Sequence, residues 1–157
     1  DEQATYLLNY ALHKVTLEGT AKSVRATFPN INMAGKTGTT DDYRDSWFSG
    51  FDKNMLITTW IGKDNNQPVN LSGASGAMQL FIGYQQLQEP KSLVRRFPDG
   101  LGIAHFDNAT GKLSKAGCTD TYSVPAITAA LPATPRKCAG ESRVPEKPKS
   151  WWQKIFG

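Results

Sequence analysis

The heptapeptide Ala34-Gly35-Lys36-Thr37-Gly38-Thr39-Thr40 is the stretch from which the fold and function of this chain are predicted most directly. Gly38 has no Cβ, so a ligand backbone can lie against the chain there and pair with it as an added strand. The ammonium of Lys36 and the hydroxyls of Thr37 and Thr39 are clustered donors, which suit a carboxylate or a developing oxyanion. The simpler alternative is a strand followed by a turn, with Lys36 an ordinary solvated cation.

The segment before the motif predicts a helix. Apolar residues recur there at helical spacing, which indicates a largely buried helix that stops near Gly19. They are Ala4, Leu7, Leu8, Ala11 and Val15. After the break at Phe28-Pro29-Asn30, the motif strand is expected over 31–39.

The segment after the motif predicts a hairpin and a second long helix. Strands are expected over 46–51 and 55–61, and a helix over 73–87 with Ala77, Phe81 and Tyr84 on one stripe. The large side chains of the hairpin are expected to cover both faces of a sheet sandwiched by helices. They are Trp47, Phe48, Phe51, Ile57, Trp60 and Ile61. The predicted fold class is therefore α+β, with an antiparallel sheet covered by helices and an irregular C-terminal tail.

Composition changes after Gln88. Seven of the nine prolines lie beyond it, and residues 1–88 carry a net charge of −1 whereas the remainder carries +5. We therefore predict two regions, 1–88 and a Pro-rich basic extension over 89–157. The extension should contain a small hairpin over 102–113, a linker-like stretch over 145–149 and a short amphipathic or disordered end over 150–156.

Cys118 and Cys138 are the two cysteines of the chain, and they flank a Pro- and Thr-rich loop. Such a pair fits a disulfide in an oxidising compartment, and the alternative is two unpaired thiols. His13 and His105 are too few and too isolated to predict a metal site, and no cofactor is expected. The net charge of +4 and the absence of a nucleic-acid motif argue against a nucleic-acid partner.

Several motifs together resemble the C-terminal part of the transpeptidase domain of class A penicillin-binding proteins. They are the stretch from Ala34 to Thr40, Trp47-Phe48-Ser49-Gly50, Thr59-Trp60-Ile61-Gly62, Asp64-Asn65-Asn66-Gln67-Pro68 and Gly73-Ala74-Ser75-Gly76-Ala77-Met78. The resemblance covers about Ala4 to Leu87. It implies a partial penicillin-binding/β-lactamase-like transpeptidase fold.

The resemblance also implies an activity. Class A members are bifunctional peptidoglycan synthases, which combine a glycosyltransferase with a D,D-transpeptidase that β-lactams acylate. The implied partners are peptidoglycan stem peptides, β-lactams, cell-envelope synthesis proteins and an outer-membrane lipoprotein activator. The implied location is the periplasmic side of the bacterial inner membrane, with an anchor outside this chain, because no apolar run here approaches the ~20 residues that span a bilayer.

Transpeptidases of this kind carry Ser-x-x-Lys and Ser-x-Asn motifs beside Lys-Thr-Gly. No serine of this chain begins either pattern, so the nucleophile and its activating lysine are missing. We therefore expect a fragment that partners the N-terminal part of the same protein and is inactive alone. The resemblance implies catalytic roles for Lys36 and Thr39, and substrate binding by Thr37, Gly38, Thr39 and Thr40.

Two other functions remain open. A β-lactamase shares Lys-Thr-Gly and the hairpin, but its chain normally stops soon after the last helix, whereas this chain continues for about seventy residues with paired cysteines. A non-catalytic penicillin-binding-like sensor or binding module is the other alternative. An upstream Ser-x-x-Lys motif and a glycosyltransferase domain would favour the synthase over both.

Overall fold

The computed structural model describes residues 1–94, 96–133, 135 and 138. They form two compact units, Asp1–Asp99 and a second unit that begins at Gly100. The first unit contains, in order, α1 (Glu2–Leu17), α2 (Lys22–Thr27), β1 (Ala34–Thr39), a 3-10 turn η1 (Asp41–Tyr43), β2 (Ser46–Phe51), β3 (Leu56–Ile61) and α3 (Ala77–Gln86). The second contains β4 (Leu101–Asp107), β5 (Leu113–Ser114), β6 (Thr121–Ile127) and a 3-10 turn η2 (Thr128–Ala130).

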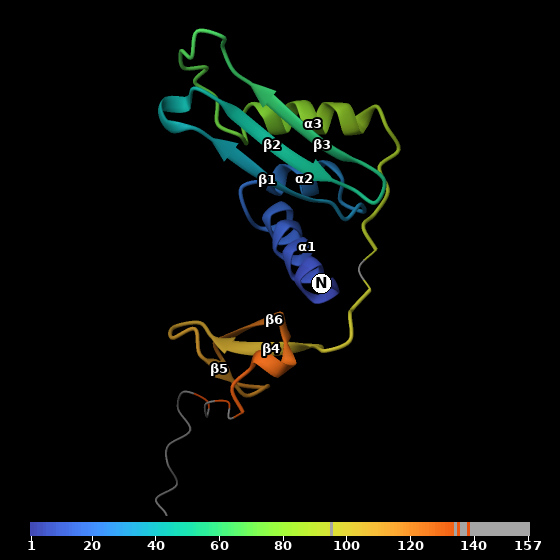
Figure 1. Ribbon diagram of the computed structural model, residues 1–157, viewed down its shortest axis with the longest axis vertical. Coiled ribbons are helices and arrows are strands. Elements are labelled where there is room, and N and C mark those ends of the chain that lie inside the picture. Colours follow the sequence, from blue (N-terminus) through green and yellow to red (C-terminus); the bar gives the residue numbers. More distant parts are fainter. Residues whose placement is uncertain (95, 134, 136–137, 139–157) are drawn as a thin grey trace, which may run out of the picture. The chain divides into compact units, whose positions relative to one another are not determined.

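The first unit is built on an antiparallel sheet in the order β1-β2-β3, with α2 and α3 behind the strands in Figure 1. Gly35 and Gly50 are cross-strand partners, and a Cβ on Gly50 would lie 2.9 Å from the Phe81 ring of α3. The two glycines therefore leave the space into which Phe48 and Phe81 pack edge to face, with ring centroids 4.9 Å apart. The predicted α+β class with an antiparallel sheet is confirmed.

Within the described residues, helices cover only one face of this sheet. Phe48 is fully buried on that face, whereas Trp47 and Trp60 on the opposite face are 42% and 46% exposed. The expectation that hairpin side chains bury both faces is therefore wrong for this chain. Strand alternation explains the split, because odd and even positions of one strand point to opposite faces.

Helix α1 is less buried than its apolar spacing predicts. Ala4, Leu8 and Ala11 are exposed, and the buried residues are His13 and Thr16. Both polar side chains contact one backbone group, with His13 Nδ1 2.7 Å and Thr16 Oγ1 2.9 Å from the carbonyl oxygen of Met33. These hydrogen bonds orient the helix so that Val15 packs against the core while Ala4, Leu8 and Ala11 stay exposed.

Helix α3 begins at Ala77 rather than at Gly73. Ser46 explains the later start, because its hydroxyl donates to the Ser72 carbonyl and accepts from the Ala77 N–H. Residues 73–76 are thereby held as a turn. The predicted stripe also needs one correction: Ala77 and Phe81 are buried, but Tyr84 is 43% exposed.

Composition changes at Gln88, but the first unit continues to Asp99. The segment between these points, called the strap below, is held by hydrogen bonds from its backbone. Lys91 N–H donates to the Asp52 carboxylate, and Leu93 N–H donates to the Asn32 carbonyl. Farther along, the Phe97 ring packs edge-on against Tyr6 at 5.2 Å. A Pro- and Lys-containing stretch thus belongs structurally to the unit that precedes it.

The second unit is a small antiparallel sheet in the order β5-β4-β6. The expected pairing of β4 with a strand near Leu113 is present, but β5 has only two residues. Most of the pairing is with β6, which the sequence analysis did not predict; it contains Pro125, a residue tolerated on edge strands. The linker-like stretch over 145–149 and the segment over 150–156 lie outside the described residues.

Candidate functional site

The predicted motif forms strand β1, which is an edge strand of the described sheet. Lys36 lies opposite Ser49, Thr37 opposite Phe48 and Thr39 opposite Ser46. Side chains alternate along a strand, so Lys36 starts on the exposed face while Thr37 and Thr39 start on the face that carries Phe48. The three donors that the sequence places side by side are therefore divided between two faces.

The outer edge of β1 brings groups of all three residues back together. Thr40 N–H donates to the Asp45 carbonyl at 3.2 Å, which makes Thr40 and Asp45 a hydrogen-bonded pair. Because such pairs alternate in an antiparallel ladder, the backbone groups of Thr37 and Thr39 turn away from β2 toward the edge. The Lys36 ammonium reaches the same edge, since it donates to the Thr37 carbonyl at 2.8 Å.

The threonine hydroxyls have partners within the first unit. The Thr37 hydroxyl lies 2.8 Å from the Thr20 hydroxyl in the α1–α2 turn. The Thr39 hydroxyl accepts from the Gly73 N–H at 2.9 Å, which leaves its own proton available to a ligand. The resemblance drawn from the motifs implies that the Gly19-Thr20 segment lies near the floor of the site, with a simple helix end as the alternative, and Thr20 does contact the motif strand.

Thr40 contacts a residue that the sequence analysis did not select. Its hydroxyl accepts from the Asp45 N–H at 2.8 Å and donates to Asp45 Oδ2 at 3.0 Å. Asp45 Oδ1 in turn accepts from the Trp60 indole N–H at 2.9 Å. No simple spacing rule predicts this contact. The pairing of β2 with β3, and not closeness in the sequence, brings Trp60 beside Asp45.

Gly38 opens the exposed face of the sheet next to the motif. It lies opposite Trp47, which lies opposite Trp60 in the next strand, and the two tryptophan rings are 5.9 Å apart. Above Gly38 an added Cβ would meet only the Trp47 side chain, at 3.2 Å. Gly38 therefore leaves room on this face beside the Trp47 side chain.

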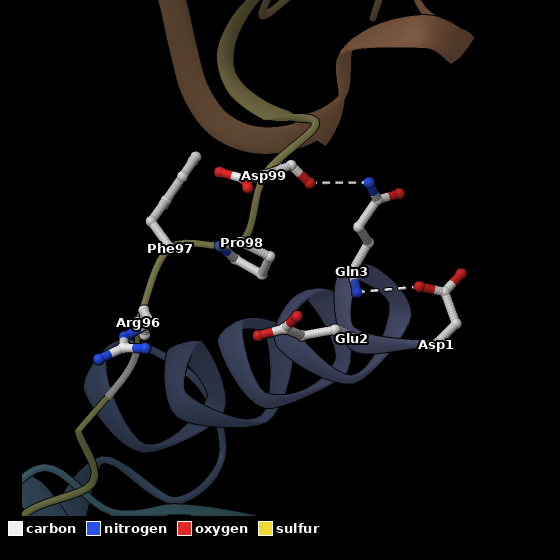
Figure 2. Close-up of a pocket in the computed structure, with 7 residues that line it drawn as sticks. All are labelled: Asp1, Glu2, Gln3, Arg96, Phe97, Pro98 and Asp99. Carbon is white, nitrogen blue, oxygen red and sulfur yellow. Dashed lines mark hydrogen bonds between the residues drawn. The ribbon is translucent and has the colours of Figure 1, made fainter.

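Other features lie away from the motif. Figure 2 shows a hollow where residues 96–99 cross the start of α1, and none of the motif residues lines it. Within the part of the chain that the structure describes, no group of His, Cys, Asp and Glu could hold a metal ion, and no helix is both long and apolar enough to cross a membrane. In the second unit, Cys118 and Cys138 are joined by a disulfide.

Comparison with known proteins gives a consistent result. No protein-family model matches the chain. Penicillin-binding protein 1B of Vibrio cholerae serotype O1 is 35% identical over 156 residues, which cover 99% of this chain and 19% of that protein. Penicillin-binding protein 1B of Escherichia coli K12 is 45% identical over 91 residues, 58% of this chain and 11% of that protein.

A solved structure agrees with the sequence relatives. The crystal structure of penicillin-binding protein 1A from Haemophilus influenzae matches with a TM-score of 0.71 at 25% identity, covering 83% of this chain and 21% of that one. The chain thus spans about a fifth or less of the length of these relatives.

The edge-strand motif and these similarities define a segment of a penicillin-binding protein. The chain belongs to the class A members, and the relatives named penicillin-binding protein 1B are 35% to 45% identical to it in the matched regions. The resemblance inferred from the motifs, which the sequence placed nearest to penicillin-binding protein 1B, is therefore confirmed at the level of the family.

Proposed function

We propose that this chain forms one wall of the active site of a D,D-transpeptidase within a bifunctional peptidoglycan synthase. One observation carries the proposal: the Lys36 ammonium lies at the same strand edge toward which the backbone of Thr39 turns. A cation and a backbone N–H at one edge suit a substrate with a terminal carboxylate and a carbonyl that becomes an oxyanion.

The reaction that this wall would serve is acyl transfer. A serine outside this chain attacks the carbonyl carbon of the penultimate D-Ala of a stem peptide, and an ester forms as the D-Ala-D-Ala bond breaks. The proton of the serine leaves with the terminal D-Ala. The amine of a second stem peptide then displaces the ester, forms the cross-link and returns a proton to the serine.

Each motif residue has a proposed role. The Thr39 N–H completes the oxyanion hole with the serine's own N–H, a type of donor whose loss costs about 3 kcal/mol of barrier. Lys36 holds positive charge near the terminal carboxylate and polarises a serine of the second motif. Thr37, Thr39 and Thr40 bind the substrate, the first two through the carboxylate, and Gly38 admits the substrate backbone.

The setting follows from the proposed reaction. Stem peptides and β-lactams are the substrate-side partners, and the N-terminal part of the same protein supplies the serine. Stem peptides are cross-linked outside the cytoplasm, so we place the chain on the periplasmic side of the inner membrane, where the Cys118–Cys138 disulfide can form. Envelope-synthesis proteins or an outer-membrane lipoprotein activator are further proposed partners.

A β-lactamase-type hydrolase and a non-catalytic sensor remain the competing functions. The sheet of β4, β5 and β6 follows the last helix of the first unit, and a β-lactamase has no need of it. A sensor could retain the motif strand without a serine. Labelling with a fluorescent penicillin separates these cases: we expect a stable adduct on the full-length polypeptide and none on the 157-residue chain alone.

Lys36→Ala tests the proposed site within the full-length polypeptide. We expect acylation to slow about 100-fold with little change in melting temperature, because Lys36 is exposed and its ammonium donates to a backbone carbonyl at the strand edge. Lys53→Ala is the matched control, since Lys53 lies in the β2–β3 turn, outside the motif strand. Normal acylation by Lys36→Ala, or rapid hydrolysis of the wild-type adduct, would contradict the transpeptidase proposal.

A further inference from the structure

Asp45 is the last residue of the connection between the motif strand β1 and strand β2. It immediately precedes β2, and its side chain is engaged on both oxygens: Oδ1 accepts from the Trp60 indole N–H at 2.9 Å and Oδ2 from the Thr40 hydroxyl at 3.0 Å. One carboxylate therefore joins the end of β1 to β3 across the start of β2. Hydrogen bonds to an ionised acceptor are stronger than neutral ones.

The turn between Thr40 and Asp45 contains the single 3-10 turn η1, whose backbone is strained. Asp42 and Tyr43 both have positive φ, at 57° and 54°, a conformation that costs energy for residues other than glycine. Outside contacts compensate for this cost. The Tyr43 carbonyl accepts from the Val69 and Asn70 N–H groups at 2.9 and 3.3 Å.

The hydrogen bond to Asp45 also helps to fix the orientation of Trp60. Its ring is 46% exposed, so burial alone does not immobilise it. Gly62 leaves the necessary room, since a Cβ there would lie 2.0 Å from the Trp60 ring and 2.9 Å from Asp45 Oδ1. The absence of a side chain at Gly62 lets the indole and the carboxylate meet.

We propose that Asp45 is a positioning residue for acyl transfer: it holds Thr40, and through it the adjoining N–H of Thr39, at the place where the oxyanion forms. The inference rests on the proposed function. This role differs from a purely structural one, because Thr40, which Asp45 holds, directly follows Thr39, whose N–H would bind the oxyanion. A displacement of about 1 Å at such a donor can lower a rate by up to 100-fold.

The effect of losing Asp45 should fall on the chemical step. The oxyanion develops only in the transition state, so a misplaced N–H slows acylation more than it weakens the initial binding of the β-lactam. In the full-length polypeptide, we expect Asp45→Ala to lower the acylation rate constant 10- to 100-fold and to change the dissociation constant of the non-covalent penicillin complex less than threefold. Asp45→Asn keeps an acceptor for Trp60 and should restore most of the rate.

A matched control lies at the opposite end of the same strand. Asp52 immediately follows β2, and its carboxylate also accepts backbone hydrogen bonds, but none of its partners belongs to the motif. We expect Asp52→Asn to lower the melting temperature without changing the acylation rate constant of the folded enzyme. Trp60→Phe, which removes only the indole N–H and part of the ring, provides a second variant should Asp45→Ala not fold, and should slow acylation 3- to 10-fold.

The outcomes separate the two proposals. A wild-type polypeptide that no penicillin labels overturns the proposed function itself. If the wild type is labelled and Asp45→Ala or Trp60→Phe is acylated at the wild-type rate constant, the positioning role is wrong while the function stands. It is equally wrong if Asp52→Asn slows acylation as much as Asp45→Ala does, because the effect would then follow stability alone.

Discussion

The backbone of Gly73 lies directly against that of Gly38. A Cβ on Gly73 would lie 2.6 Å from the Gly38 carbonyl oxygen and 2.9 Å from the Gly38 nitrogen, both closer than real Cβ contacts allow. The loop before α3 therefore supports the motif strand from the buried side, and the Gly73 N–H adds a hydrogen bond to Thr39. Only a residue without a side chain fits at this crossing.

Gly73→Ala should therefore destabilise the full-length protein by about 2 kcal/mol, because the new methyl group meets backbone atoms that cannot move aside independently. Denaturant unfolding measures the change. Gly83→Ala is the control of opposite sign: an added Cβ there meets nothing within 4 Å, and alanine favours the helix by about 0.5–1 kcal/mol. Equal midpoints for the two variants would contradict this account of the loop.

Asp52→Ala should cost about 3 kcal/mol of stability. The buried carboxylate accepts from the N–H groups of Asn54, Met55 and Lys91 at 2.7, 2.8 and 2.8 Å, and alanine leaves all three without that acceptor. Hydrogen exchange should show faster opening of the β2–β3 turn and of the strap near Lys91. Unchanged protection at Lys91 would show that the strap is held by other contacts.

Gln85→Met should raise stability by about 1 kcal/mol. Gln85 is 1% exposed, and its Nε2 has no hydrogen-bond partner among the described residues. Methionine has a similar shape and removes the cost of burying an unsatisfied amide. Thermal unfolding of Gln85→Met beside Gln86→Met, which alters the exposed neighbour, measures the difference; a lower melting temperature for Gln85→Met would reveal a bound water or another acceptor at the amide.

Removing the disulfide should destabilise the second unit by about 3 kcal/mol in the chain-entropy estimate, because the bond joins residues that are 20 apart in sequence. Calorimetry of Cys118→Ser/Cys138→Ser protein measures the loss. Mass spectrometry of periplasmically expressed wild type under non-reducing conditions should find no alkylatable thiol. Two free thiols would contradict both the bond and the proposed compartment.

The sequence by itself determined the family and most of the local structure. The motif residues from Ala34 to Thr40, the hairpin pattern after them and the apolar helix that follows are local signals, and each corresponds to an observed element. Element ends were less predictable. The late start of α3 depends on Ser46, a residue far from it in sequence, so no local pattern contains that information.

Only the tertiary structure decided which side chains meet. Strand alternation separates Lys36 from Thr37 and Thr39, and the outer edge of β1 then reunites the Lys36 ammonium with their backbone groups. Strand register alone places Asp45 against Trp60, and a hydrogen bond from Thr16 to Met33, rather than apolar spacing, helps to choose the inner face of α1. Contacts of this kind form between segments that are distant in the chain, so the periodicity of one segment cannot predict them.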